Sequence, residues 1–172
     1  MPKGLKQSSS IIIIGARVEE TAADTFTQTR VDLQLNPLDN EVFVVLGANL
    51  DVGSPDLINS RNTASTMTMT TTSQSAMPRL SDSAVLAKAE KVIRTETGGG
   101  DSAVSFQEQF AETPASSLLE YVGIIATNDF FLQIEGSNNG LAKTGSAKIY
   151  GYRATADAST YAALVQSEVL TA

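Results

Sequence analysis

The chain has 172 residues, a formal net charge of −7, and neither cysteine nor histidine. This length is enough for one domain with a substantial hydrophobic core, and no apolar run approaches the roughly 18 residues of a membrane helix. The missing cysteine and histidine exclude disulfides, thiolate metal sites and the commonest general base. The acidic balance argues against a nucleic-acid site, because attraction to phosphate needs a basic face.

The N-terminal segment changes abruptly from polar to apolar. Residues 1–10 are polar and carry two lysines but no acid, so we expect a flexible arm ahead of a single β-sandwich domain over residues 11–172. The four isoleucines that follow predict a strand with apolar side chains on both faces, and both faces need cover. Either another polypeptide covers the outward isoleucines, which we favour, or the strand lies between two layers of its own domain. The candidate assembly arm is Lys3, Lys6, Ile11, Ile12, Ile13 and Ile14.

Alternation of apolar and polar residues predicts four strands in the first half of the chain. They span residues 11–18, 25–35, 41–50 and 63–73. A turn at residues 36–40, which contains proline, asparagine and aspartate, predicts that the second and third strands pair as a hairpin. In the fourth strand Met67 and Met69 share one face. The threonines on its other face form either a solvated surface or one that hydrogen-bonds a partner.

A helix is predicted in one connection, over residues 82–95. Apolar residues recur there at helical spacing, with Val85 four residues before Ala89. A further strand is expected over residues 103–110. The C-terminal residues 157–170 are either a final helix or an irregular tail.

The segment 118–154 has the most regular pattern in the chain. Residues 118–126, 130–135 and 146–154 predict three strands joined by turns rich in asparagine, aspartate and glycine. We expect an antiparallel meander, because parallel neighbours need a crossover of a dozen or more residues.

No pattern typical of an enzyme stands out. No histidine is present to activate a nucleophile, and the paired acids Glu19 and Glu20 are best read as solvated surface groups. We therefore expect no catalytic, cofactor-binding or metal-binding residue. Tyr150 and Tyr152 share a strand face, and an exposed pair could stack on a sugar ring, so they form a candidate ligand platform. The alternative is that the pair covers a core edge or an interface.

The predicted elements define a mainly β fold. We expect an antiparallel β-sandwich or single jelly roll of about seven to nine strands, with the helix at residues 82–95 in one connection and a short C-terminal helix as an option.

The chain combines a basic N-terminal arm, threonine- and alanine-rich strands, the absence of cysteine and histidine, and the closing run of residues 136–154. In this combination of features it resembles the single jelly-roll coat or decoration proteins of viruses of prokaryotes. The resemblance implies a non-catalytic structural protein of the virion, which assembles with copies of itself and with other virion proteins. The alternatives are a carbohydrate-binding or adhesive β-sandwich, extracellular or at the cell surface, and a tail-tube or filament subunit.

Overall fold

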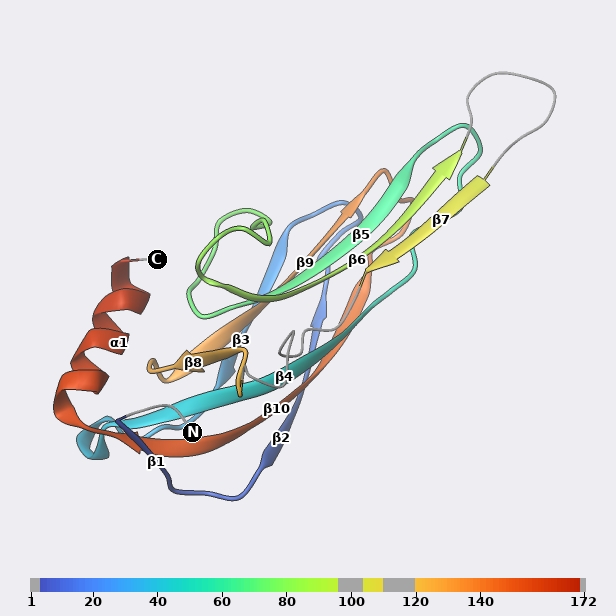
Figure 1. Cartoon of the computed structure of the whole chain (residues 1–172). Helices are drawn as coiled ribbons and strands as arrows, with labels where there is room; N and C mark the ends of the chain where they lie inside the picture. The colour runs from blue at the N-terminus through green and yellow to red at the C-terminus, as the bar shows by residue number, and fades with distance from the viewer. Residues whose placement is uncertain (1–3, 96–103, 110–119, 171–172) are drawn as a thin grey trace.

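The structure, a computed structural model, describes residues 4–95, 104–109 and 120–170. In these ranges the chain forms two five-stranded antiparallel sheets and one α-helix near the C-terminus (Figure 1). Sheet I consists of β1 (Leu5–Gln7), β2 (Ile12–Glu19), β4 (Glu41–Val52), β8 (Gly123–Ile125) and β10 (Thr144–Ala156). Sheet II consists of β3 (Thr27–Asp32), β5 (Thr63–Thr70), β6 (Val85–Thr95), β7 (Val104–Gln109) and β9 (Asp129–Ser137). The helix α1 spans Ala158–Leu170, and a short 3-10 turn, η1, spans Pro37–Asp39. The predicted mainly β sandwich is confirmed.

The strand order is that of a jelly roll. In sheet I, β1 and β2 lie one after the other along one edge of β10, and β4 and β8 follow on its other side. In sheet II the order is β3, β9, β5, β6, β7. The pairs β2 with β10, β3 with β9 and β4 with β8 are nested around the hairpin of β5 and β6. Such nesting describes one long hairpin, which is rolled up so that β10 also pairs with β4, and β9 with β5.

Two predicted strand pairings are wrong. The predicted hairpin of residues 25–35 and 41–50 does not form, because β3 and β4 belong to different sheets. The predicted meander does not form either, because β8, β9 and β10 alternate between the two sheets. The turn chemistry is present, since Asn36 caps η1 by accepting a hydrogen bond from the backbone N–H of Leu38 at 3.1 Å. These turns carry the chain across the sandwich and not along a sheet.

The predicted helix over residues 82–95 is also wrong, because most of this segment is β6. Across the strand pair, Ala89 lies opposite Met67 and Ala87 opposite Met69. All four side chains are fully buried, so small residues on one strand face large residues on the other. Pairing with β5 on one side and β7 on the other outweighs the helix propensity of the alanine- and lysine-rich sequence.

The N-terminal segment is more ordered than the flexible arm that we expected. Leu5 is opposite Ala156 in the ladder of β1 and β10, and the backbone N–H of Ser8 donates to the carbonyl oxygen of Arg153 at 2.8 Å. Strand β10 would otherwise present unpaired backbone groups along this edge, and any sequence can supply main-chain partners. Residues 4–10 therefore belong to the domain, and Lys3 lies outside the described residues.

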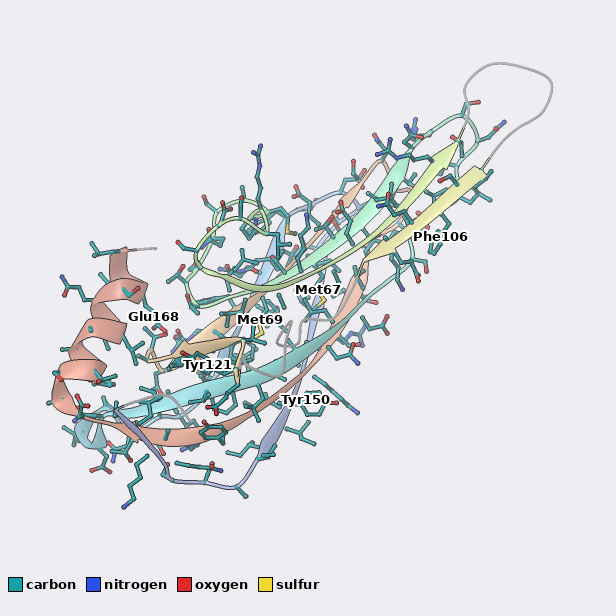
Figure 2. The ribbon with its side chains drawn as sticks, in the orientation of Figure 1. Met67, Met69, Phe106, Tyr121, Tyr150 and Glu168 are labelled. Carbon is teal, nitrogen blue, oxygen red and sulfur yellow. The ribbon has the colours of Figure 1, made fainter. Side chains whose placement is uncertain are left out.

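The main core fills the space between the two sheets. Its largest fully buried side chains come from β4, β5, β9 and β10 and from the residue that ends β8: Phe43, Leu50, Met67, Met69, Ile125, Phe130, Leu132, Ile134 and Ile149. The prediction that Met67 and Met69 share one strand face is confirmed, and that face points into the core, where both labels lie between the sheets in Figure 2.

A second apolar cluster lies on the outer face of sheet I, under α1. Val42 and Val44 of β4 and Ala154 of β10 pack there, with Leu164 and Val165 of the helix against them. Sheet I is therefore covered on both faces at the helix end, which explains the continuous apolar run of residues 42–46. Of the two alternatives for residues 157–170, the helix is the one that forms, and Figure 1 shows it at one end of the sandwich.

Candidate assembly interface

One margin of sheet I, among the residues that the structure describes, is formed by β2 and the residue before it. Ile12 and Ile14 are half-buried against the main core, whereas Ile11 and Ile13 are each 61% exposed. The five residues from Ile11 to Gly15 carry no charge. Edge strands are usually protected by charges, bulges or a covering segment, and a long uncharged apolar edge invites pairing. The isoleucine strand thus pairs within its own domain, and the alternative that it lies between two layers of that domain is wrong, because its outward side chains are exposed.

The two candidate platform tyrosines do not form an exposed pair. Tyr150 lies opposite Ile13 in the ladder of β10 and β2 and is half-buried. Tyr152 is 8% exposed and belongs to the cluster under α1. Burial raises the pKa of the Tyr152 hydroxyl, and the nearby Tyr121 adds a smaller contribution. Figure 2 marks Tyr150 near the outer face of sheet I, beside the β2 margin.

A shallow hollow lies next to the exposed isoleucines. A Cβ atom added at Gly15 would meet no atom within 4 Å, and the hollow beside it, of about 430 Å³, is also lined by Asn49 and Lys148. Our sequence interpretation did not single out Gly15. A glycine inside a predicted strand is itself a signal of close approach by another backbone or ligand, and could have found it.

The opposite margin of the sandwich is formed by β7, the last strand of sheet II. Val104 and Phe106 are 55% and 53% exposed, and Phe106 lies opposite Ile93 in the ladder with β6. Figure 2 shows Phe106 at this margin, far from α1. We predicted the strand but not its role as an apolar edge.

The threonine row of β5 is largely used within the chain. Thr68 donates from Oγ1 to Oε1 of the fully buried Gln133 at 2.8 Å, and Gln133 donates from Nε2 to Thr70 Oγ1 at 2.6 Å and to Gln28 Oε1 at 3.0 Å. Thr68 and Thr70 are buried. These two positions are therefore not available to hydrogen-bond a partner.

Glu20 is a structural carboxylate and not the solvated acid that we expected. It is 4% exposed. Its Oε1 accepts hydrogen bonds from the backbone N–H groups of Gly136 at 2.6 Å and Thr25 at 3.1 Å, and its Oε2 accepts from that of Lys143 at 2.6 Å. A buried carboxylate needs such donors, and here they tie the loop after β2 to β9 and to the loop before β10.

A neighbouring ion pair fixes the loop after β4 to the same end of the sandwich. Lys143 Nζ lies 2.5 Å from Asp56 Oδ1, and the Lys143 side chain is only 7% exposed. Asp56 Oδ2 accepts from the backbone N–H groups of Gly140 and Leu141. The Lys143 hydrogen bond, followed by these backbone donors, lowers the pKa of Asp56, and partial burial opposes the shift. These contacts hold the loop after β4 to the loop before β10.

At the other end, Glu168 anchors α1 to the turn between β8 and β9. Its two carboxylate oxygens accept from the backbone N–H groups of Ala126 at 2.8 Å and Thr127 at 2.9 Å. Burial raises the pKa of Glu168, whereas the hydrogen bonds from Ala126 and Thr127 lower it. Figure 2 shows Glu168 on the side of the helix that faces the sheets.

The structure and the comparisons identify no cofactor chemistry or family. Within residues 4–95, 104–109 and 120–170 no group of three or more acidic side chains could hold a metal ion. No helix among these residues is long and apolar enough to cross a membrane. No protein-family model matches the chain, and a search of curated proteins finds no similar sequence. The features of this protein that bear on its function are therefore the jelly-roll fold and the apolar margins at β2 and β7.

Proposed function

We propose that this protein is a non-catalytic structural subunit of a virion, a capsid or capsid-decoration protein, that acts by self-assembly with copies of itself and with other virion proteins. The jelly-roll topology supports the proposal, because viral capsid domains are among the proteins built on it. Many functions share this fold, so the topology alone is an analogy. The specific support comes from the surface.

The observation that carries the proposal is a pair of apolar margins on opposite sides of the sandwich. Strand β2 packs against β3, and β4 packs against β5 and β6, so the β2 margin lies on one side and the β7 margin on the other. Ile11, Ile13, Val104 and Phe106 are each more than half exposed there. A subunit with contact surfaces on two sides can join more than one neighbour, which closed rings and shells require.

The carbohydrate-binding alternative loses its structural basis in the single chain. It required two exposed tyrosine rings side by side, and Tyr152 is buried under α1. The tail-tube alternative would use the same margins to form stacked rings or tubes. The shape of the particles therefore distinguishes it from a shell.

Electron microscopy of the purified protein at micromolar concentration tests the proposal. We expect closed or shell-like particles in the wild type. Ile13→Ser and Phe106→Ser should each reduce particle formation while the circular dichroism spectrum and thermal unfolding stay near wild type, since both side chains are more than half exposed. Leu141→Ser is the matched control, because Leu141 is 70% exposed outside both margins.

Two outcomes would contradict the proposal. Wild-type protein that remains monomeric, alone and with the other components of its virion, would remove the assembly function. Stacked rings or tubes in place of closed particles would favour the tail-tube alternative.

A further inference from the structure

We propose that two copies of this chain pair through the free edges of their β2 strands, antiparallel, about a two-fold axis beside Ile13. In this register Ile13 lies opposite Ile13 of the second copy, and Ile11 lies opposite Gly15. The inference deepens the proposed function and rests on it for one point, that the chain associates with itself. It names the contact, its register and its symmetry.

The first support is an edge that is free to pair. One side of β2 is paired with β10 over its whole length, from Ile12 opposite Gly151 to Glu19 opposite Thr144. Within the part of the chain that the structure describes, its other side has no strand neighbour in the sheet. Antiparallel pairing of two identical edges about a two-fold axis makes the same contacts on both copies, so a single strand can serve as both halves of the interface.

The second support is a projection and a hollow at matching distances from Ile13. Ile11 projects into solvent two residues before Ile13, and Gly15 leaves its outward position empty two residues after it. In an antiparallel pair centred on Ile13, each Ile11 therefore meets the Gly15 hollow of the other copy. Two Ile13 side chains meet at the centre, each beside the half-buried Tyr150 of its own chain.

The third support is the absence of a charge conflict. The register places Ile12–Ile14 of the two β2 strands opposite each other. In the wider overlap of residues 8–18, which includes the bend at Ser9, Arg17 is the only charged residue, and it lies opposite Ser9. On the inner side Ile12 lies opposite Ile14 of the other copy, so the half-buried isoleucines are covered as well. Directly opposite side chains in such a pair have Cβ atoms about 4.5–5.5 Å apart, close enough for contact.

A second copy fits this edge better than an unrelated partner does. Another protein would need a projecting side chain and a hollow at the same spacing along its strand. This chain carries both, because Ile11 and Gly15 each lie two residues from Ile13. The free edge of β2 offers backbone groups for pairing, and the spacing of Ile11, Ile13 and Gly15 sets the register of the pair.

Disulfide cross-linking tests the register directly, because the chain has no cysteine of its own. Ile13→Cys should form an intermolecular disulfide under mild oxidation, since antiparallel partners have Cα atoms about 4.5–5.5 Å apart, within disulfide range. An equimolar mixture of Ile11→Cys and Gly15→Cys should give the mixed dimer. Ile11→Cys alone should not cross-link, because its two copies lie about 14 Å apart along the strand, at 3.4 Å per residue.

Gly15→Val is the second variant, and it separates the contact from folding. The added side chain enters open space, and valine favours strands, so the monomer should unfold at the wild-type temperature or slightly above it. In the dimer it occupies the hollow that receives Ile11. We expect the dissociation constant measured by sedimentation to rise about tenfold or more, a change equivalent to about 1.4 kcal/mol. An unchanged constant would contradict the inference.

The outcomes distinguish this inference from the proposed function. Particles that form from the Ile13→Cys variant without an intermolecular disulfide would overturn the β2 contact and leave the shell proposal standing. A cross-linked dimer that never grows further would support the β2 contact and contradict a shell. A disulfide in Arg17→Cys as strong as that in Ile13→Cys would show unspecific collision and overturn the register.

Discussion

Gly151 lies in β10 at the point where the register with β4 shifts. A Cβ atom at this position would meet the carbonyl oxygen of Val44 and would lie 2.6 Å from ring carbons of Phe43. Both neighbours are fully buried, so neither can move away into solvent. The close approach explains why this position carries glycine.

Gly151→Ala should therefore destabilise the fold by about 1–3 kcal/mol, the usual cost of overpacking a core. Urea denaturation measures the change in the free energy of unfolding. Gly140→Ala is the matched control, because it adds the same methyl group where the nearest non-adjacent neighbour, Asp56 Oδ2, lies at an ordinary 3.8 Å, and it should be close to neutral. Equal effects of the two substitutions would contradict this explanation.

The ion pair of Asp56 and Lys143 makes stability depend on pH. The folded-state pKa of Asp56 is lowered from its usual 3.8, so its contribution is complete above pH 3.8 and is lost as pH falls through the lower value. Asp56→Asn should cost about 1.5–3 kcal/mol at pH 7, because it removes a charged hydrogen bond to the buried Lys143. Between pH 4 and pH 2 the stability of the Asp56→Asn variant should also fall less than that of the wild type.

Thermal unfolding over that pH range measures both effects. Asp51→Asn serves as the control, because the Asp51 side chain is 78% exposed and 3.6 Å from Lys91, where solvent screens the pair. A wild type and an Asp56→Asn variant with parallel pH profiles would show that the ion pair does not act in this way.

At the scale of elements, Glu168 anchors α1 by polar contacts beside the apolar cluster under the helix. Glu168→Ala leaves the backbone N–H of the buried Ala126 without its acceptor, which should cost about 1–3 kcal/mol. Urea denaturation followed by circular dichroism measures it. Val169→Ala changes the neighbouring residue, which is 64% exposed, and should stay within about 0.5 kcal/mol of wild type. A Glu168→Ala variant as stable as Val169→Ala would contradict the anchoring role.

The positions of most strands could be predicted from alternation, but their partners could not. The predicted strands at residues 25–35, 41–50, 63–73 and 103–110 all exist; the second extends two residues further than predicted, and the other three are shorter. Their turns are local and visible in the sequence, whereas the sheet that the next strand joins depends on how the whole chain rolls up. Strand β6 was predicted as a helix because its alanines fit both periods, and only the facing methionines of β5 decide between them.

The candidate interface was predicted in part. The run of isoleucines showed that two side chains would need cover, and Ile11 and Ile13 are indeed exposed. The two lysines of the candidate assembly arm add nothing to the apolar surface, since Lys6 is exposed on β1 and Lys3 lies outside the described residues. Phe106 and Gly15 were missed, because their importance depends on which strands lie at the edges, and this is a property of the folded sheet.

At the scale of the whole molecule, the two margins differ in a way that bears on assembly. The β2 margin carries both a projection and a hollow around Ile13, and therefore suits a symmetric contact with itself. The β7 margin presents Val104 and Phe106 as projections, and we assign no hollow to them among the described residues. One symmetric contact yields only a dimer, so growth into a shell would require a second contact, and we propose the β7 margin for it.

Sedimentation velocity of the wild-type protein over a concentration series from nanomolar to micromolar tests self-assembly most directly. We predict a dimer at low concentration and species larger than a dimer as the concentration rises. Ile13→Ser should shift dimer formation to higher concentration, and Phe106→Ser should do the same for the larger species. A single monomeric species across the whole series, also when the other virion components are added, would contradict the account.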